Sequence, residues 1–433
     1  MTQEHTPHLL IQGGTLLNPE SGEQKKADIR IKDGVIVEVG AGLKSQGEAS
    51  YDATGKLISI GWMDMHVHLR EPGFEHKETI ITGSRAAAFG GFTAVACMPN
   101  TNPPIHTRDV VEFIIERAEK TPVDVYPIAC VSKNRAGESL SEMADLAAGG
   151  AVAFSDDGSP VQDSGLMRHA LEYSSMLNMP IINHEEDLAL GVKGHMHEGE
   201  VSTRLGLPGI PGLSEEIMIA RDILLAEYTG GHVHVAHIST AKAVDQVREA
   251  KKNGIKVTTE VCTHHFSITD SWVETSGYDT NTKMHPPLRP QSDIDGIKAG
   301  LADGTIDAIC TDHAPHASFE KEVEYISAPF GILGLETAWG LTGREIVATG
   351  VLSVAQAVHK LSVAPRSILS IELPSIEVGQ KANLTIFDAT TEWEFSAKDI
   401  KSKSTNTPFV GSKMVGKAWA VYNKGILVNN AAE

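Results

Sequence analysis

Eight short runs of apolar and β-branched residues alternate with helical patterns through the middle of this 433-residue chain. Each run ends in polar or small residues, as strands do where they meet a loop. The runs cover residues 58–68, 92–98, 123–131, 151–155, 180–185, 232–238, 256–265 and 307–312. Eight strands alternating with helices predict a (β/α)8 TIM barrel, in which functional residues lie at the carboxyl ends of the strands.

The two ends of the chain have a different pattern. Residues 9–40 and 383–428 contain short apolar runs separated by turn sequences, among them Lys32-Asp33-Gly34 and Asn423-Lys424-Gly425. Neither end can bury enough surface to be stable by itself. We therefore expect an α/β protein with residues 58–365 as the barrel, and with 1–57 and 366–433 combined in a small β-sandwich, rather than two or three ordinary domains.

The charge and the cysteines restrict the class of protein. The formal net charge of -19 argues against a nucleic-acid or membrane surface, although an acidic protein can still hold a local cationic pocket. The four cysteines are far apart in apolar runs and form no Cys-x-x-Cys motif. The N-terminus lacks a signal-peptide pattern, and no apolar segment is long enough to cross a membrane. These features predict buried thiols in a cytoplasmic protein.

Histidine pairs mark candidate metal ligands. Random placement of 19 histidines in 433 residues gives about 0.8 His-x-His pairs, and the chain has three: His66/His68, His195/His197 and His232/His234. The first pair closes the first strand run. Alternation along a strand predicts that it shares a face with Trp62 and Asp64. His195/His197 lies in a Gly-rich stretch that is typical of a surface.

The same alternation rule can be applied to the other strand tips. In the sixth strand it groups His237 with Val233 and Val235, which predicts His237 inside the barrel and His232/His234 on the helix side. His184 closes the fifth strand, Asp156-Asp157 closes the fourth, and Asp312 closes the eighth. Such a set of nitrogen and oxygen ligands suits Zn²⁺, as one ion or as two ions bridged by a carboxylate. Strand parity does not choose between Asp156 and Asp157. His264-His265 could support the site or simply pack.

Taken together, these residues resemble the amidohydrolase superfamily and, more closely, the class I dihydroorotases, over essentially the whole chain. The resemblance rests on motifs distributed along the sequence, which are residues 64–72 (DMHVHLREP), 90–93 (GGFT), 98–101 (MPNT), 154–158 (FSDDG), 183–187 (NHEED), 234–240 (HVAHIST), 286–289 (PPLR), 311–316 (TDHAPH) and 329–332 (PFGI).

This resemblance implies a role for each matching residue. It implies zinc ligands at positions 66, 68, 157, 184, 237 and 312, which are His66, His68, Asp157, His184, His237 and Asp312. It implies substrate binding by Arg70, Asn100 and His316 and by the backbone at Phe330-Gly331. Asp312 would also move the proton.

Two departures from the family pattern matter. Hydantoinases and animal-type dihydroorotases bridge their metals with a carbamylated lysine, whereas the equivalent place here holds Asp156-Asp157. The resemblance favours Asp157. His285 stands where the family often has an Asn that contacts the substrate. Whether His285 contacts the substrate is therefore left open, although it is kept among the candidate substrate-binding residues.

The resemblance implies a zinc-dependent cyclic amide hydrolase that interconverts (S)-dihydroorotate and N-carbamoyl-L-aspartate in pyrimidine synthesis. Arg70 and Asn100, together with the missing lysine, argue against the nearest rival, a hydantoinase or allantoinase. The farther rival is an inactive scaffold for aspartate transcarbamoylase, and the full ligand set argues against it. We expect a homodimer, with association with the transcarbamoylase as an additional possibility.

Overall fold

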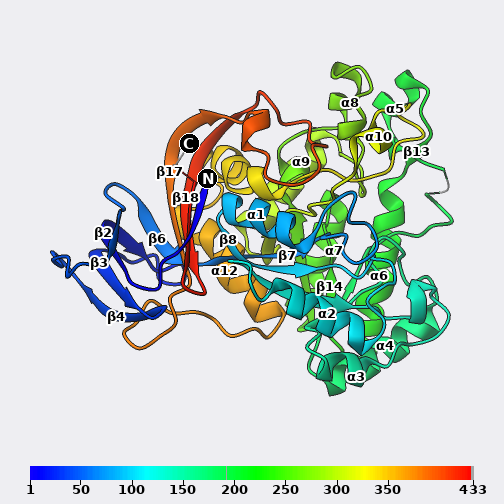
Figure 1. Ribbon diagram of the computed structural model, residues 1–433. Helices are drawn as coiled ribbons and strands as arrows, with labels where there is room; N and C mark the ends of the chain where they lie inside the picture. The colour runs from blue at the N-terminus through cyan, green and yellow to red at the C-terminus, as the bar shows by residue number, and fades with distance from the viewer. Residues whose placement is uncertain (192, 431–433) are drawn as a thin grey trace.

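Two large sheets organise the protein (Figure 1). The computed structural model describes residues 1–191 and 193–430. One sheet has eight strands and forms the barrel, and the other is a nine-stranded mixed sheet built from both ends of the chain. The α/β class predicted from the strand pattern is therefore confirmed.

The barrel strands are parallel, and one strand falls in each predicted run. They are β7 (Trp62–Val67), β8 (Phe92–Cys97), β9 (Asp124–Ala129), β10 (Ala153–Phe154), β11 (Ile181–Asn183), β14 (Val233–Val235), β15 (Val257–Cys262) and β16 (Ala308–Cys310). A parallel bridge between Val67 and His313, with the amide of His68 donating to the carbonyl of His313 at 2.9 Å, joins the last strand to the first. The sheet is therefore closed, and its carboxyl ends form one rim.

The first predicted run is two strands and not one. β6 (Leu57–Ile60) belongs to the terminal sheet, and β7 begins after Gly61. A Cβ on Gly61 would lie 1.9 Å from Oδ1 of Asn383 and 2.1 Å from Oγ1 of Thr93. The backbone can change sheets here because glycine permits this close approach.

Helices surround the barrel, as the alternating pattern predicts (Figure 1). The longer ones are α1 (Ile80–Gly90), α2 (Arg108–Ala118), α4 (Ser164–Met176), α6 (Gly212–Thr229), α7 (Ala241–Lys252), α9 (Gln291–Ala302) and α12 (Val354–Ile368). The shorter ones are α3 (Met143–Ala148), α5 (Glu200–Leu205), α8 (Ser271–Thr275), α10 (Ser318–Lys321) and α11 (Ala338–Thr342). Among the described residues, no helix is long and apolar enough to cross a membrane.

The terminal sheet combines strands from both ends of the chain. Its strands are β1 (Thr2–His5), β2 (Leu9–Leu17), β3 (Gln24–Lys32), β4 (Val35–Gly40), β5 (Ala49–Asp52), β6, β17 (Leu384–Glu394), β18 (Lys413–Asn423) and β19 (Ile426–Asn429). β6 pairs with β17 and β1 pairs with β19, so the two termini lie side by side in Figure 1. Both predicted hairpin turns, at Asp33-Gly34 and at Lys424-Gly425, are present. A two-stranded sheet, β12 (Met196–His197) with β13 (Gly209–Ile210), lies apart from both.

Two apolar layers hold the barrel together. Small and flexible side chains such as Ala94, Ala96 and Met65 pack in one buried cluster, whereas Trp62 and Val67 belong to another, which includes residues of the surrounding helices. The Trp62 ring lies 4.9 Å from the rings of both Trp339 and Phe387, so it joins the barrel to the terminal sheet. The prediction that Trp62 shares a face with His66 and His68 is therefore wrong. The register of β7 is irregular on both sides of residues 63 and 64, and strict alternation fails there.

Candidate metal and substrate site

The predicted site residues gather at the carboxyl rim of the barrel. A cavity of about 540 Å³ opens there. Its wall includes eleven of the predicted residues, which are His68, Arg70, Asn100, Asp157, His184, His237, His285, Asp312, His316, Phe330 and Gly331. His66, the remaining one, is fully buried directly behind them.

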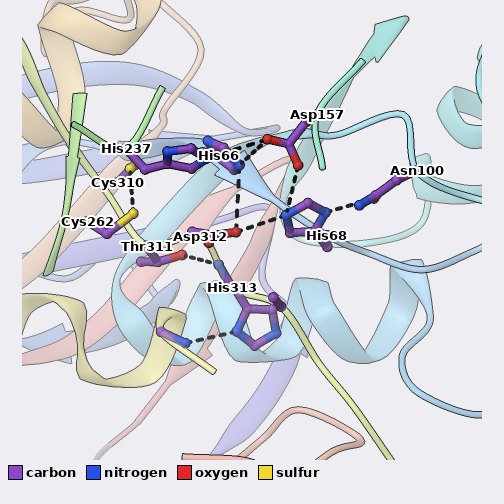
Figure 2. Close-up of polar contacts among 12 residues, drawn as sticks. His66, His68, Asn100, Asp157, His237, Cys262, Cys310, Thr311, Asp312 and His313 are labelled. Atoms are coloured by element: carbon purple, nitrogen blue, oxygen red, sulfur yellow. Dashed lines mark hydrogen bonds and ion pairs between the residues drawn. The ribbon is translucent and has the colours of Figure 1, made fainter. Parts of the chain in front are cut away.

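Asp157 directs its carboxylate at the histidines, and Figure 2 shows its contacts with His66 and His68. Its Oδ1 is 3.5 Å from Nε2 of His66, 3.8 Å from Nδ1 of His184 and 3.7 Å from Nε2 of His237. Its Oδ2 is 3.6 Å from Nε2 of His68. Two groups of potential metal ligands therefore share this one carboxylate: His66/His68/Asp157 and Asp157/His184/His237.

Asp312 completes the first group from the opposite side of the rim. Its Oδ1 lies 2.9 Å from Nε2 of His68 and 3.6 Å from Nε2 of His66 (Figure 2). Asp312 has a φ of 47°, which is unusual for a residue other than glycine. The chain turns sharply after β16 and directs this carboxylate into the cavity.

The geometry and the charges of the cluster fit a divalent cation. Two ligands of one tetrahedral zinc lie about 3.4 Å apart, given metal–ligand distances of about 2.0–2.2 Å. Nε2 of His66 and Oδ1 of Asp157 are buried and have no hydrogen-bond partner among the described residues. Burial lowers the pKa of His66, but the surrounding carboxylates, Asp157 first, outweigh it and raise this pKa to about 10. The carboxylates of the cluster therefore favour a positive charge beside them, which a bound cation would supply.

The two neighbouring aspartates have different environments. Asp156 turns away from the histidines and accepts a hydrogen bond at 3.1 Å from the amide of Ser132, which follows β9. Burial raises the pKa of Asp156. The structure thus places Asp157, and not Asp156, among the potential ligands.

Two other side chains orient the first histidine pair. Nδ1 of His66 is 2.6 Å from Oε1 of Glu260, and Nδ1 of His68 is 2.8 Å from Oδ1 of Asn100. Each contact leaves Nε2 of the same ring free to face Asp157 and Asp312. The sequence analysis missed Glu260, although a glutamate inside the apolar strand β15 is itself an unusual signal.

In the sixth strand, β14, the prediction that His234 faces the helices and that His237 shares a face with Val233 and Val235 is wrong. Val233 and Val235 pack in the helix-side core, whereas His234 is fully buried with Nε2 3.6 Å from Oε2 of Glu260. β14 ends at Val235, and His237 has a φ of 32°, so the chain no longer alternates when it reaches His237. His237 lies in the site as predicted, but strand alternation is not what places it there.

The substrate-side candidates form a connected wall. Arg70 has a φ of 63°, and its Nε donates to the carbonyl of Pro315 at 3.2 Å. Nε2 of His316 lies 3.5 Å from the Arg70 guanidinium and donates to the carbonyl of Phe330 at 2.9 Å. Burial, reinforced by Arg70, lowers the pKa of His316 to about 2, so its ring is neutral at physiological pH. Gly331 has a φ of 130°, and a Cβ there would lie 2.8 Å from that of Ala314.

An asparagine from the C-terminal segment holds this wall. Oδ1 of Asn406 accepts from the amide of His316 at 3.0 Å, while Nδ2 donates to the carbonyls of Ala314 at 3.0 Å and Gly331 at 3.1 Å. No local pattern marks Asn406, because its partners lie 75 to 92 residues away in the chain.

The remaining residues singled out in the sequence lie partly at the cavity and partly in the core. His285 lines the cavity, where it stacks on His184 at 4.9 Å and contacts Oε2 of Glu186 at 2.8 Å through Nε2. His195 is partly exposed and lines the cavity, and it belongs to none of the groups of potential metal ligands among the described residues. His265 contacts the carbonyl of Pro286 at 3.0 Å through its Nε2, which is the only side-chain hydrogen bond of His265 within the described part of the chain. All four cysteines are free and buried, as predicted.

Comparisons with known proteins place the chain in a family. Residues 55–243 match the family model described as "Dihydro-orotase-like". A dihydroorotase of Pelotomaculum thermopropionicum is 52% identical over 97% of this chain and 98% of its own length. One of Citrifermentans bemidjiense is 49% identical over 98% of this chain and its full length. The solved L-hydantoinase of Arthrobacter aurescens superposes with a TM-score of 0.86 at 24% identity, covering 98% of this chain and 96% of its own, and this likeness shows the fold alone.

Proposed function

Since the chain belongs to the dihydroorotase family and is therefore a cyclic amide hydrolase, we propose which residues perform its reaction and with which metal. The reaction opens the ring amide of (S)-dihydroorotate with water to give N-carbamoyl-L-aspartate, and closes it again in pyrimidine synthesis. The observation that carries the proposal is the convergence of six side chains from five strand ends, with four histidines around the Asp157 carboxylate and Asp312 against two of them.

Zinc is the metal that this ligand set favours, because imidazole and carboxylate donors together suit Zn²⁺. The residues that would hold one or two zinc ions are His66, His68, Asp157, His184, His237 and Asp312. When bound, zinc makes water nucleophilic near neutral pH and polarises the ring carbonyl. His66 and His68 are held for this task by Glu260 and Asn100.

Asp312 is the proposed proton carrier. Its carboxylate faces the cavity and takes the proton of the attacking water, then returns it to the ring nitrogen that leaves. One group can do both because the proton lost in the attack is the proton needed by the leaving nitrogen.

The substrate carboxylate binds to Arg70. The planar guanidinium can form two parallel hydrogen bonds with a carboxylate, and its Nε contact with Pro315 fixes its plane. Asn100 and His316 add polar contacts, and the backbone at Phe330-Gly331 lies against the pyrimidine ring. His285, fixed by Glu186, lines the cavity beside Phe330, and the centres of the two rings are 4.9 Å apart.

The proposal is tested by assaying purified protein with dihydroorotate and with N-carbamoyl-L-aspartate, alongside elemental metal analysis. The Asp312→Asn variant should fold and lose at least about a hundredfold in turnover, since an amide cannot carry the proton. Near-native turnover in this variant would assign the proton transfer to another group. Hydantoin and allantoin serve as rival substrates, and faster hydrolysis of either would contradict the proposed substrate.

We also propose that the protein is a cytoplasmic homodimer. Four apolar side chains on α6 form an exposed stripe, Leu213, Ile217, Leu224 and Tyr228, with exposed fractions of 46, 41, 64 and 72%. Exposed apolar surface of this extent on one helix face is typical of a subunit contact. Free buried thiols suit a reducing compartment. We propose further that the protein associates with aspartate transcarbamoylase. Residues 58–365 then form the catalytic barrel, and residues 1–57 and 366–433 form the two parts of the terminal β-sandwich.

A further inference from the structure

Two buried lysines join the two chain segments that form one wall of the cavity. Lys283 lies in the segment 280–285, which leads to His285. Lys321 is the last residue of the short helix α10, within the loop 316–331 that carries His316, Phe330 and Gly331. The two residues are only 2% and 6% exposed. Burying an ammonium group is costly unless all of its donors are satisfied.

Lys321 reaches from the loop 316–331 to the segment 280–285. Its Nζ donates to the carbonyls of Thr280 at 3.0 Å and Lys283 at 3.3 Å, and to the carbonyl of Pro329, within its own loop, at 2.8 Å. Three acceptors match the three N–H donors of an ammonium group. The side chain therefore fixes the position of Pro329, directly before Phe330, against the neighbouring segment.

Lys283 reaches in the opposite direction. Its Nζ donates to the carbonyls of Tyr325 at 2.8 Å and Ile326 at 3.0 Å, and it lies 4.7 Å from the centre of the Phe330 ring. The amide of Gly331 donates to the carbonyl of Lys283 at 2.9 Å. Each lysine thus binds the backbone of the segment that carries the other, and within residues 1–191 and 193–430 neither has a carboxylate within ion-pair distance.

We propose that Lys283 and Lys321 are positioning residues for substrate binding. They hold Phe330 and Gly331 at a fixed distance from His285, and the carbonyl of Phe330 in turn orients His316 beside Arg70. This inference rests on the proposed binding roles of His316, Phe330 and Gly331, and adds the device that sets their geometry.

The test compares Lys283→Met and Lys321→Met with a matched control, Lys360→Met. Lys360 is also a buried lysine, 8% exposed, and donates to the carbonyl of Ile306, which precedes β16 at the opposite end of the barrel. The two wall variants should raise the KM for dihydroorotate about tenfold, with kcat within about twofold and metal content unchanged. The control should lose stability but keep its KM.

Hydrogen–deuterium exchange supplies a readout that does not depend on activity. Backbone amides in residues 322–332 should exchange faster in both wall variants than in the wild type. Their exchange rates should be unchanged in Lys360→Met. If a methionine variant does not fold, Lys283→Gln or Lys321→Gln retains part of the donor set and should show a smaller rise in KM. Native KM and native exchange in the wall variants would overturn the inference. A wild-type protein with no activity on dihydroorotate, but with faster exchange in the wall variants, would instead overturn the proposed substrate.

Discussion

At the residue scale, a substitution of Arg70 can test substrate binding without disturbing the metal ligands. Its Nε is held by Pro315, and it contacts none of the potential metal ligands through a hydrogen bond in the described structure. Arg70→Lys keeps the charge but loses the planar pair of donors. We expect the KM for dihydroorotate to rise about tenfold to a hundredfold while the zinc content is unchanged. Steady-state kinetics with metal analysis check this, and native kinetics would remove Arg70 from the carboxylate site.

Asp156 and Asp157 provide a matched pair at neighbouring positions. Asp157 faces four histidines, whereas Asp156 accepts a hydrogen bond from the amide of Ser132. Asp157→Ala should therefore lower zinc stoichiometry more than Asp156→Ala, because loss of a ligand costs more than loss of a supporting contact. Elemental analysis of both variants decides the order. The reverse order would move the ligand to Asp156.

The same carboxylate predicts how the metal-free protein recovers. A carbamylated lysine must be assembled from CO₂, but an aspartate is already a carboxylate. Protein stripped of metal and reconstituted with zinc should regain the same activity with and without bicarbonate. A clear requirement for bicarbonate would mean that a lysine bridges the metals after all.

At the element scale, strand β15 carries a residue that acts across the barrel. Glu260 is fully buried and contacts His66 of β7 at 2.6 Å, and its other oxygen faces His234 of β14. Glu260→Gln removes the charge but keeps the shape. We expect zinc affinity to fall about tenfold to a hundredfold, as for other residues that orient metal-binding histidines. Competition with a chromogenic chelator measures this, and unchanged affinity would reduce Glu260 to a packing role.

The strands also show where alternation succeeds as a predictor. It places Ala308 and Cys310 correctly in β16, with Asp312 beyond them at the rim. It fails in β7, whose register shifts twice, and in β14, which is only three residues long. Period-2 reasoning requires a regular strand, and a bulge or an early end changes the face of every residue that follows.

At the scale of the whole molecule, the stripe on α6 predicts the oligomeric state. Leu224 is the third of the four residues in this stripe, and its side chain is 64% exposed. In a symmetric dimer the same patch faces itself, so Leu224→Glu would place two like charges in one contact. We expect this variant to be monomeric by light scattering. Val378→Glu is the control, since Val378 is 62% exposed and lies outside the helices. A monomeric wild type, or a dimeric Leu224→Glu, would contradict the proposed interface.

The sequence by itself determined the barrel, the positions of its strands and the sheet shared by the two ends. Strand runs, helix patterns and turn residues are local signals, and closing eight strands brings their carboxyl ends to one rim. The tertiary structure shows that Asp157 and not Asp156 faces the histidines, which strand parity alone left open. Only the tertiary structure decided that Glu260 holds His66 from 194 residues away, and that Asn406 and two lysines hold the substrate wall. These contacts join segments distant in the chain, and their geometry depends on strand irregularities and loop packing that no local period encodes.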